Sequence, residues 1–220
     1  EPELRAFMEG FNKELEARLP VAAGLSKISI QTGTSHGGVV LPDGSIAEVS
    51  VDFKTLQQLS AIAKEYGMGG AVQHGASTLP AEAFSRFAEA NTLEVHLATG
   101  FQNILYDELP SDLLEDIFAY LRDNHSNERK EGQTDDQFYY KTRKRAIGPF
   151  KQALWDLPKS TIHTIEKKWE EQFKLLFERL NVGGTREMVQ RFTKVVPIQP
   201  RIGSYLAESG GVGDVSELDD

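Results

Sequence analysis

Two histidines of this chain, His36 and His74, have the residue type and the surroundings of metal ligands. Each follows a stretch whose pattern predicts a β-strand, and each precedes a glycine. A catalytic zinc site commonly uses three protein ligands and keeps one position open for substrate. A glycine beside such a ligand lets the backbone approach a bound molecule, because no Cβ stands in the way. The pair predicts a metal site if the two strands are neighbours. The alternative is that each histidine is a polar loop residue.

The elements that would position these histidines alternate along the chain. Apolar–polar alternation, or a short buried apolar run, predicts strands at residues 25–32, 70–73 and 93–97. Helical spacing predicts helices at residues 2–19, 54–66, 81–90 and 111–121. Strands that alternate with helices are typical of βα units around a parallel sheet. We therefore expect an α/β fold, namely the C-terminal part (about three βα units) of a TIM (β/α)8 barrel plus a C-terminal helical extension. In such barrels the chemistry lies on the loops that follow the strands.

The composition divides the chain into parts. We predict the barrel part at residues 1–123, a polar linker or mobile loop at 124–137, the helical extension at 138–208 and an acidic, disordered tail at 209–220. Within the extension we expect helices at residues 139–157, 161–180 and 185–194. Two helices carry apolar stripes at helical spacing: Phe7, Phe11, Leu15 and Leu19 in the first helix, and Trp169, Phe173, Leu176 and Leu180 in the extension. The second stripe predicts a face for core or subunit packing.

The composition also narrows the classes of function. The net charge of -9 argues against a nucleic-acid or anionic-membrane surface, because both bind clustered Lys and Arg. The chain has no cysteine, so a metal would have to use histidine nitrogen and carboxylate oxygen. No apolar run approaches the ~20 residues of a transmembrane helix, and we expect a cytoplasmic protein. One short basic cluster, residues 141–145, is either a solvated helix start or a small anion site.

Four short stretches carry the polar residues of the candidate site. They read TGTSHG at residues 32–37, QHGAST at 73–78, VHLAT at 95–99 and FYYKTR at 138–143. The first two resemble the zinc-ligand loops of class II, zinc-dependent fructose-bisphosphate aldolases, and the second of these also cradles a phosphate. The third stands where that family has Asn-Ile-Asp-Thr on its last strand. The fourth resembles the Tyr-Tyr-Asp-Pro-Arg stretch before the family's C-terminal helix. The resemblance covers residues 2–157.

Carried over by position, the resemblance implies a role for each matched residue. His36 and His74 would bind Zn²⁺ or another divalent cation. Whether a monovalent cation also binds beside it is left open. Arg143 would meet the distal phosphate of the second substrate, which suits the bidentate donors of a guanidinium. The phosphate of dihydroxyacetone phosphate would be held by backbone N–H groups and hydroxyls of four residues: Gly37, Gly75, Ser77 and Thr99.

The activity that the resemblance implies is that of an aldehyde-lyase in carbohydrate metabolism, for example in glycolysis. It is the reversible aldol cleavage of a ketose (bis)phosphate such as fructose 1,6-bisphosphate. Zinc would act as a Lewis acid on the ketose and stabilise the enediolate. No Schiff-base lysine is needed, and none is predicted at the carboxyl end of a strand. Lys27 lies at the start of its strand, on the face of a barrel that serves stability.

Two positions depart from the family. His96 stands where the family has the Asn that orients substrate, and Ala98 stands where it has the following Asp. We assign His96 a catalytic role as a substitute hydrogen-bond donor, with an extra metal ligand or a satisfied interior histidine as the alternatives. These departures leave the substrate open. They also leave two other interpretations: a non-catalytic aldolase-like protein that binds a sugar phosphate or serves in an assembly, and another metal-dependent barrel enzyme.

The predicted barrel is incomplete in this sequence. A barrel needs eight βα units, typically about 250 residues, and three are predicted here. Open parallel strands would expose an edge, which proteins avoid. We therefore expect the first half of the barrel to come from another chain or from a segment outside this sequence. The expected partners are a sugar phosphate and further copies of the chain in a homo-oligomer.

Overall fold

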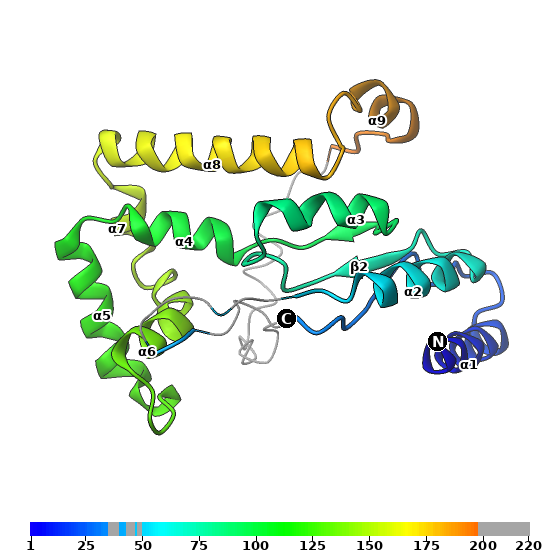
Figure 1. The fold of residues 1–220 in the computed structure, drawn as a ribbon, viewed down its shortest axis with the longest axis horizontal. Coiled ribbons are helices and arrows are strands. Elements are labelled where there is room, and N and C mark those ends of the chain that lie inside the picture. Colours follow the sequence, from blue (N-terminus) through cyan, green and yellow to red (C-terminus); the bar gives the residue numbers. More distant parts are fainter. Residues whose placement is uncertain (35–39, 43–46, 48–49, 198–220) are drawn as a thin grey trace. The chain divides into compact units, whose positions relative to one another are not determined.

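The computed structural model describes residues 1–34, 40–42, 47 and 50–197. The chain divides into two compact units, Glu1–Gly183 and Gly184–Asp220. The first unit combines helices with a three-stranded parallel sheet, which confirms the expected mixed α/β class (Figure 1). In chain order its elements, where η denotes a 3₁₀ helix, are α1 (Pro2–Arg18), β1 (Ile28–Ser29), α2 (Phe53–Glu65), β2 (Ala71–Gln73), η1 (Ala81–Phe84), α3 (Ser85–Glu89), β3 (Glu94–Val95), α4 (Thr99–Asp107), α5 (Ser111–His125), η2 (Ser126–Glu128), α6 (Asp135–Thr142), η3 (Arg143–Ala146), α7 (Lys151–Trp155) and α8 (Lys159–Arg179).

The sheet orders its strands as they occur in the chain, β1-β2-β3. Both pairs are parallel, with Ser29 opposite Val72 and Val72 opposite Glu94. The strands are shorter than predicted, but a backbone hydrogen bond from His96 N to Gln73 O, at 2.9 Å, continues the pairing beyond β3. The predicted parallel sheet is therefore confirmed.

Helices α2 and α3 pack on this sheet (Figure 1). The carboxylate of Asp52 begins α2 by accepting a hydrogen bond from Thr55 N at 3.0 Å, a common N-cap arrangement. The helix predicted at residues 81–90 starts as the 3₁₀ turn η1 and continues as α3. These helices, the strands and the end of α8 share a group of buried residues, here called the sheet core: Val51, Phe53, Leu56, Ala71, Ala76, Leu79, Phe84, Phe87, Ala90 and Leu176.

Helix α1 packs on α2 through Leu4 and Met8, which are buried in this contact. Phe7, a member of the apolar stripe found in the sequence, is 51% exposed. Both sets of apolar residues recur at a spacing of four, and the position of α2 decides between them. Next to this contact, Arg5, whose side chain is 41% exposed, forms an ion pair with Glu65 of α2 at 2.7 Å.

Two helical predictions fail after β3. Helix α4, which begins directly at Thr99, is not among the predicted helices. This helix contains Gly100. A Cβ added at Gly100 would lie only 3.2 Å from the carbonyl oxygen of Ser77, so the glycine allows the start of α4 to lie close to the loop after β2. The helix predicted at residues 139–157 is broken between α6 and α7. Pro149 lies in this break, and proline cannot donate a backbone hydrogen bond within a helix.

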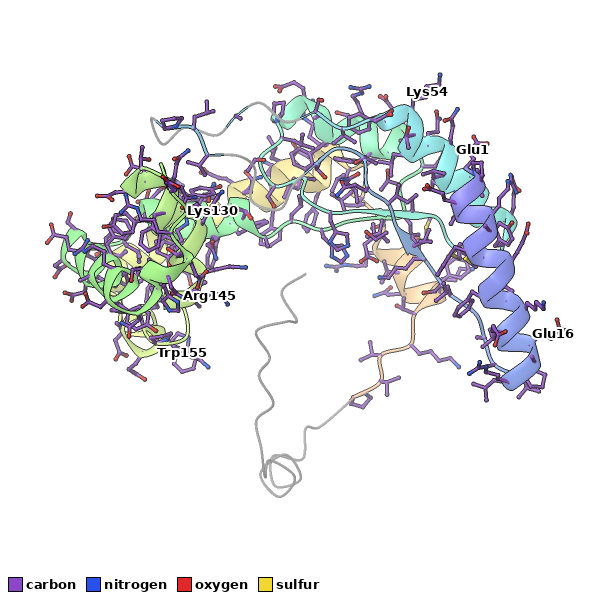
Figure 2. The ribbon with its side chains drawn as sticks, turned by 90° about the horizontal axis from the view of Figure 1, so that it is seen from below. Glu1, Glu16, Lys54, Lys130, Arg145 and Trp155 are labelled. Atoms are coloured by element: carbon purple, nitrogen blue, oxygen red, sulfur yellow. The ribbon has the colours of Figure 1, made fainter. Side chains whose placement is uncertain are left out.

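The helices after β3 form a second group of buried residues. Helix α6 begins with a capping box, in which Thr134 and Gln137 exchange hydrogen bonds between side chain and backbone. The side chains of Arg145 and Trp155 belong to this group of helices (Figure 2). We call its buried residues the helical core: Tyr106, Leu109, Ile117, Leu121, Phe138, Tyr139, Ala146, Leu157 and Ile165.

The predicted apolar stripe of α8 is a packing face, as expected. Trp169 packs on the helical core, and its Nε1 donates a hydrogen bond to Phe101 O at 3.0 Å. The ring of Phe173 lies 4.5 Å from the ring of Phe101, measured between centroids. Leu176 and Leu180 pack in the sheet core. Helix α8 therefore touches both cores.

In the second unit, α9 (Arg186–Phe192) matches the helix predicted at residues 185–194. Residues 198–220, with the tail predicted to be disordered, lie outside the described residues. Among the residues that the structure describes, no helix is both long enough and apolar enough to cross a membrane.

Candidate functional site

One face of the sheet carries polar side chains. Successive side chains of a strand point to opposite faces. Val95 packs in the sheet core, so Glu94 and His96 point to the other face. The pairing of Gln73 with Val95, continued by one residue, places His74 opposite His96. The same alternation puts Lys27 on this side of β1. We call this set the polar face: Lys27, His74, Glu94 and His96.

The rings of His74 and His96 are in contact at the carboxyl end of the sheet. Their centroids are 4.2 Å apart and their planes make an angle of 48°. The ring of His74 is half-buried, whereas the side chain of His96 is 47% exposed. The two imidazoles therefore lie side by side on neighbouring strands, and that of His96 is accessible to solvent.

Glu94 joins His96 to Lys27. One carboxylate oxygen of Glu94 is hydrogen-bonded to Nε2 of His96, and the other accepts a hydrogen bond from Nζ of Lys27 at 2.5 Å. Lys27 first, and then His96, hold the pKa of the Glu94 carboxyl below its usual value. The sequence predicts Lys27 as a residue of the stability face. The structure shows in addition that its ammonium reaches the carboxylate that contacts His96.

Gln73 fastens the loop after β1 to the end of β2. Its side chain is fully buried. Its Oε1 accepts a hydrogen bond from Thr32 Oγ1 at 2.7 Å, and its Nε2 donates to Thr34 Oγ1 at 3.0 Å. The hydroxyl of Thr34 in turn donates to His74 O at 2.8 Å. Buried amides need such partners. This network therefore holds Thr32 and Thr34, which follow β1, next to Gln73 and His74 at the end of β2.

The loop after β2 meets the start of α4. The backbone N of Ala98 donates to Ser77 Oγ at 2.9 Å, and a hydroxyl that accepts one bond still has a proton to donate. Gly75 has a φ of 70°, a left-handed conformation that favours glycine. Helix α4 starts at Thr99 without a side-chain cap. Its first N–H groups therefore point out of the helix beside Ser77, which is an arrangement that suits an anion.

Arg143 is a buried cation in the helical part of the unit. Its guanidinium lies 4.8 Å from the ring centre of Tyr106 and 4.3 Å from that of Tyr140. One Nη donates to Asn103 Oδ1, and Nε is buried without a hydrogen-bond partner. Burial lowers the pKa of this guanidinium. No carboxylate among the described residues forms an ion pair with it.

The basic cluster at residues 141–145 is not a helix start, because α6 ends inside it and η3 follows. Lys141 and Lys144 are exposed, whereas Arg143 is 9% exposed. The interpretation as a solvated helix start is therefore wrong. Asn103, the partner of Arg143, lies one helical turn after Thr99 on α4, so the same helix connects Arg143 with the loop of Ser77.

The structure brings most of the described candidate residues together. His74, Gly75, Ser77, His96 and Thr99 all lie where β2 and β3 end. His36 and Gly37, the other predicted metal ligand and phosphate residue, lie outside the described residues. Within the described part of the chain, no group of three or more His, Asp or Glu side chains is arranged to hold a metal ion.

Three residues of this region were missed by the sequence reasoning: Gln73, Glu94 and Asn103. The sequence could have indicated Glu94, because it lies two residues before His96 on a strand and must share its face. Nothing in the sequence indicated Asn103, because α4 was not predicted.

Comparisons of the chain with protein-family models, with curated proteins and with solved structures find no match.

Proposed function

We propose that the chain is the C-terminal part of a (β/α)8-barrel aldolase that cleaves a ketose phosphate or bisphosphate reversibly and depends on a metal ion. The observation that carries this proposal is the contact between His74 and His96, whose ring centroids are 4.2 Å apart at the carboxyl ends of neighbouring parallel strands. That edge is where barrel enzymes have their active sites.

The barrel itself is supported by the strand order. Successive strands of a barrel are neighbours, and β1, β2 and β3 follow this order in a parallel sheet. The helices pack on one face, and the opposite face bears Lys27 and Glu94. In a closed barrel this polar face would line the interior. The remaining strands would come from a segment outside this sequence or from another chain, in a homo-oligomer or a mixed assembly.

The proposed zinc ion would be bound by imidazoles. His74 lies at the carboxyl end of β2, and His36, which lies outside the described residues, follows the neighbouring strand β1 in the sequence. With no cysteine in the chain, imidazole and carboxylate are the donors available. A bound Zn²⁺ would supply Lewis-acid polarisation of the ketose carbonyl. Ser77 and the first N–H groups of α4 would hold the adjacent phosphate and so fix the direction in which the ketose lies.

The buried guanidinium supports a second anion site. Arg143 forms no direct ion pair with a described carboxylate, although the charge of Asp107 acts on it from nearby, and a phosphate would supply a counter-charge in direct contact. Asn103, which accepts a hydrogen bond from Arg143, lies one helical turn after Thr99 at the start of α4. Two anion sites joined by one short helix suit a bisphosphate such as fructose 1,6-bisphosphate.

The test is an aldol-cleavage assay on the full protein, including any residues that precede Glu1 in its gene. We expect cleavage of fructose 1,6-bisphosphate that a chelator abolishes and Zn²⁺ restores. His74→Ala should abolish it as well. The matched control is His163→Ala, an exposed histidine of α8 that lies away from the sheet edge, and it should keep the activity. Cleavage that resists the chelator would contradict the proposal.

One observation favours a second candidate, a non-catalytic sugar-phosphate-binding or assembly protein. An anion would stabilise the buried guanidinium of Arg143, whose Nε has no hydrogen-bond partner, whether or not a metal is bound. This candidate predicts phosphate binding without zinc binding. Zinc binding without aldol cleavage would instead favour another metal-dependent barrel enzyme or a different aldol substrate.

A further inference from the structure

We infer that the cleft between α2 and α3 is a binding site for a small organic anion, whose charged group Lys54 and Arg86 would hold. The cleft has a volume of about 300 Å³ and is lined by six residues of the two helices: Phe53, Lys54, Gln57, Arg86, Glu89 and Ala90. Both helices cover the side of the sheet opposite the polar face. The inference therefore concerns a different surface and does not depend on the proposed aldol cleavage.

The floor of the cleft is apolar and its rim is polar. Phe53 and Ala90 are buried and form the floor, whereas the four polar residues that line the cleft are exposed. Small-molecule sites commonly combine an apolar surface with a few polar groups that fix the direction of the ligand. A volume of about 300 Å³ is at the lower end of the range for such sites. We therefore expect a ligand with a short carbon skeleton.

The guanidinium of Arg86 is held at the cleft by an aromatic ring. Its central carbon lies 4.1 Å from the centre of the Phe53 ring. This cation–π contact orders the side chain, and the N–H groups of the guanidinium remain available for a carboxylate or a phosphate. Arg86 forms no ion pair with any described carboxylate, although Glu89 follows it by three residues on α3.

Lys54 supplies a second positive charge from the first turn of α2 (Figure 2). Its charge acts on the carboxyl of Asp52. Both oxygens of Asp52 accept hydrogen bonds from Thr55, from N at 3.0 Å and from Oγ1 at 2.6 Å, so this carboxylate is engaged in capping α2. Lys54 forms no ion pair with a carboxylate among the described residues. Two cations without such a pair at one cleft favour an anionic ligand.

Glu89 also lines the cleft and makes the inference sharper. Its backbone O accepts a hydrogen bond from Gln57 Nε2 at 3.5 Å, which joins the two helices. Its carboxylate would repel a bound anion, whereas Lys54 and Arg86 would attract it. Removing the charge of Glu89 should therefore strengthen binding, and removing that of Lys54 should weaken it. A gain in affinity cannot be explained by a variant that fails to fold.

The experiment follows the Nε–H signal of Arg86 by NMR in the full protein while glycerol 3-phosphate or succinate is added. The loss of this signal in Arg86→Lys assigns it. We expect at least one of the two compounds to shift the signal to saturation, and the tighter one tells a phosphate from a carboxylate ligand. Lys54→Met should weaken this binding about 5–10-fold, as the loss of one partly exposed charge contact does. Glu89→Gln should strengthen it about 2-fold.

The matched control is Lys64→Met, which removes an exposed cation from the last turn of the same helix and should leave the affinity unchanged. Because the signal comes from Arg86 itself, an anion bound near Arg143 is not mistaken for one in the cleft. The inference is wrong if neither compound moves the signal, or if Lys54→Met and Glu89→Gln both bind as the unaltered protein does. Either result leaves the proposed aldol cleavage untouched, since that activity is placed at the other side of the sheet.

Discussion

The amide oxygen of Gln73 lies 2.7 Å from the hydroxyl oxygen of Thr32, and both side chains are buried. This bond joins the loop after β1 to the end of β2. We predict that Gln73→Leu lowers the free energy of unfolding by roughly 2 kcal/mol, because it leaves the hydroxyl of Thr32 buried without its partner. Chemical denaturation measures the change. The double variant Gln73→Leu with Thr32→Val should recover part of the loss, since no orphaned hydroxyl remains. Simple additivity of the two single effects would contradict this account.

The environment of Arg143 predicts a stabilisation by anions. Inorganic phosphate should raise the free energy of unfolding of the unaltered protein, by about 2.7 kcal/mol at a concentration 100 times its Kd. Arg143→Met should remove this effect, because the guanidinium is the buried charge that a phosphate would neutralise. Thermal unfolding with and without phosphate makes the comparison. Lys151→Met, which alters an exposed cation above the ring of Trp155, should keep the full response. An equal response in all three proteins would rule out the site.

We predict that replacing Gly70 and replacing Gly10 by alanine have opposite effects on the free energy of unfolding. The φ of Gly70 is +142°, and an added Cβ would lie 2.8 Å from Ser60 Oγ. The Ser60 hydroxyl cannot easily move, because it accepts from Ala71 N and donates to Asn91 O. Gly70→Ala should therefore lower the free energy of unfolding by about 1–3 kcal/mol. Gly10→Ala should raise it by about 0.5–1 kcal/mol, since an added methyl group meets nothing there and α1 gains helix propensity. Urea unfolding of the two variants provides the test, and equal effects would speak against it.

The ion pair of Arg5 with Glu65 predicts a pH dependence of the contact between α1 and α2. Its hydrogen bond from Arg5 lowers the pKa of Glu65 from the usual 4.5. The folded state therefore binds this proton less readily than the unfolded state. The resulting stability is present above the usual carboxyl pKa and is lost as the pH falls through the lower folded value. Glu65→Gln should be less stable than the unaltered protein near neutral pH and equal to it in strong acid. Unfolding curves at several pH values test this, and a difference that is the same at every pH would contradict it.

The parallel sheet could be predicted because its signals are local. Residues 25–32 alternate in polarity, and the helix that follows has its apolar residues at helical spacing. The meeting of His74, Ser77 and Thr99 was predictable for the same reason, since parallel strands bring their carboxyl ends to one edge.

The remaining features depend on partners that lie far away in the sequence. The buried face of α1 is decided by α2, and Leu4 and Phe7 are equivalent choices until that partner is known. Helix α4 was missed because Gly100 is typical of a loop, although its small size serves contact with Ser77. The surroundings of Arg143 include Tyr106, which is 37 residues away in the chain.

Helix α8 links the two cores of the first unit at a fixed spacing. Ile165 lies in the helical core and Leu176 in the sheet core. Eleven residues of helix make about three turns and rise about 16 Å, so both side chains leave the same side of α8. One inserted residue between them would rotate Leu176 by about 100° relative to Ile165 and pull one of them out of its core. Only insertions close to whole turns preserve both contacts. The length of α8 therefore sets the spacing between the sheet, which carries His74, and the helices that carry Arg143.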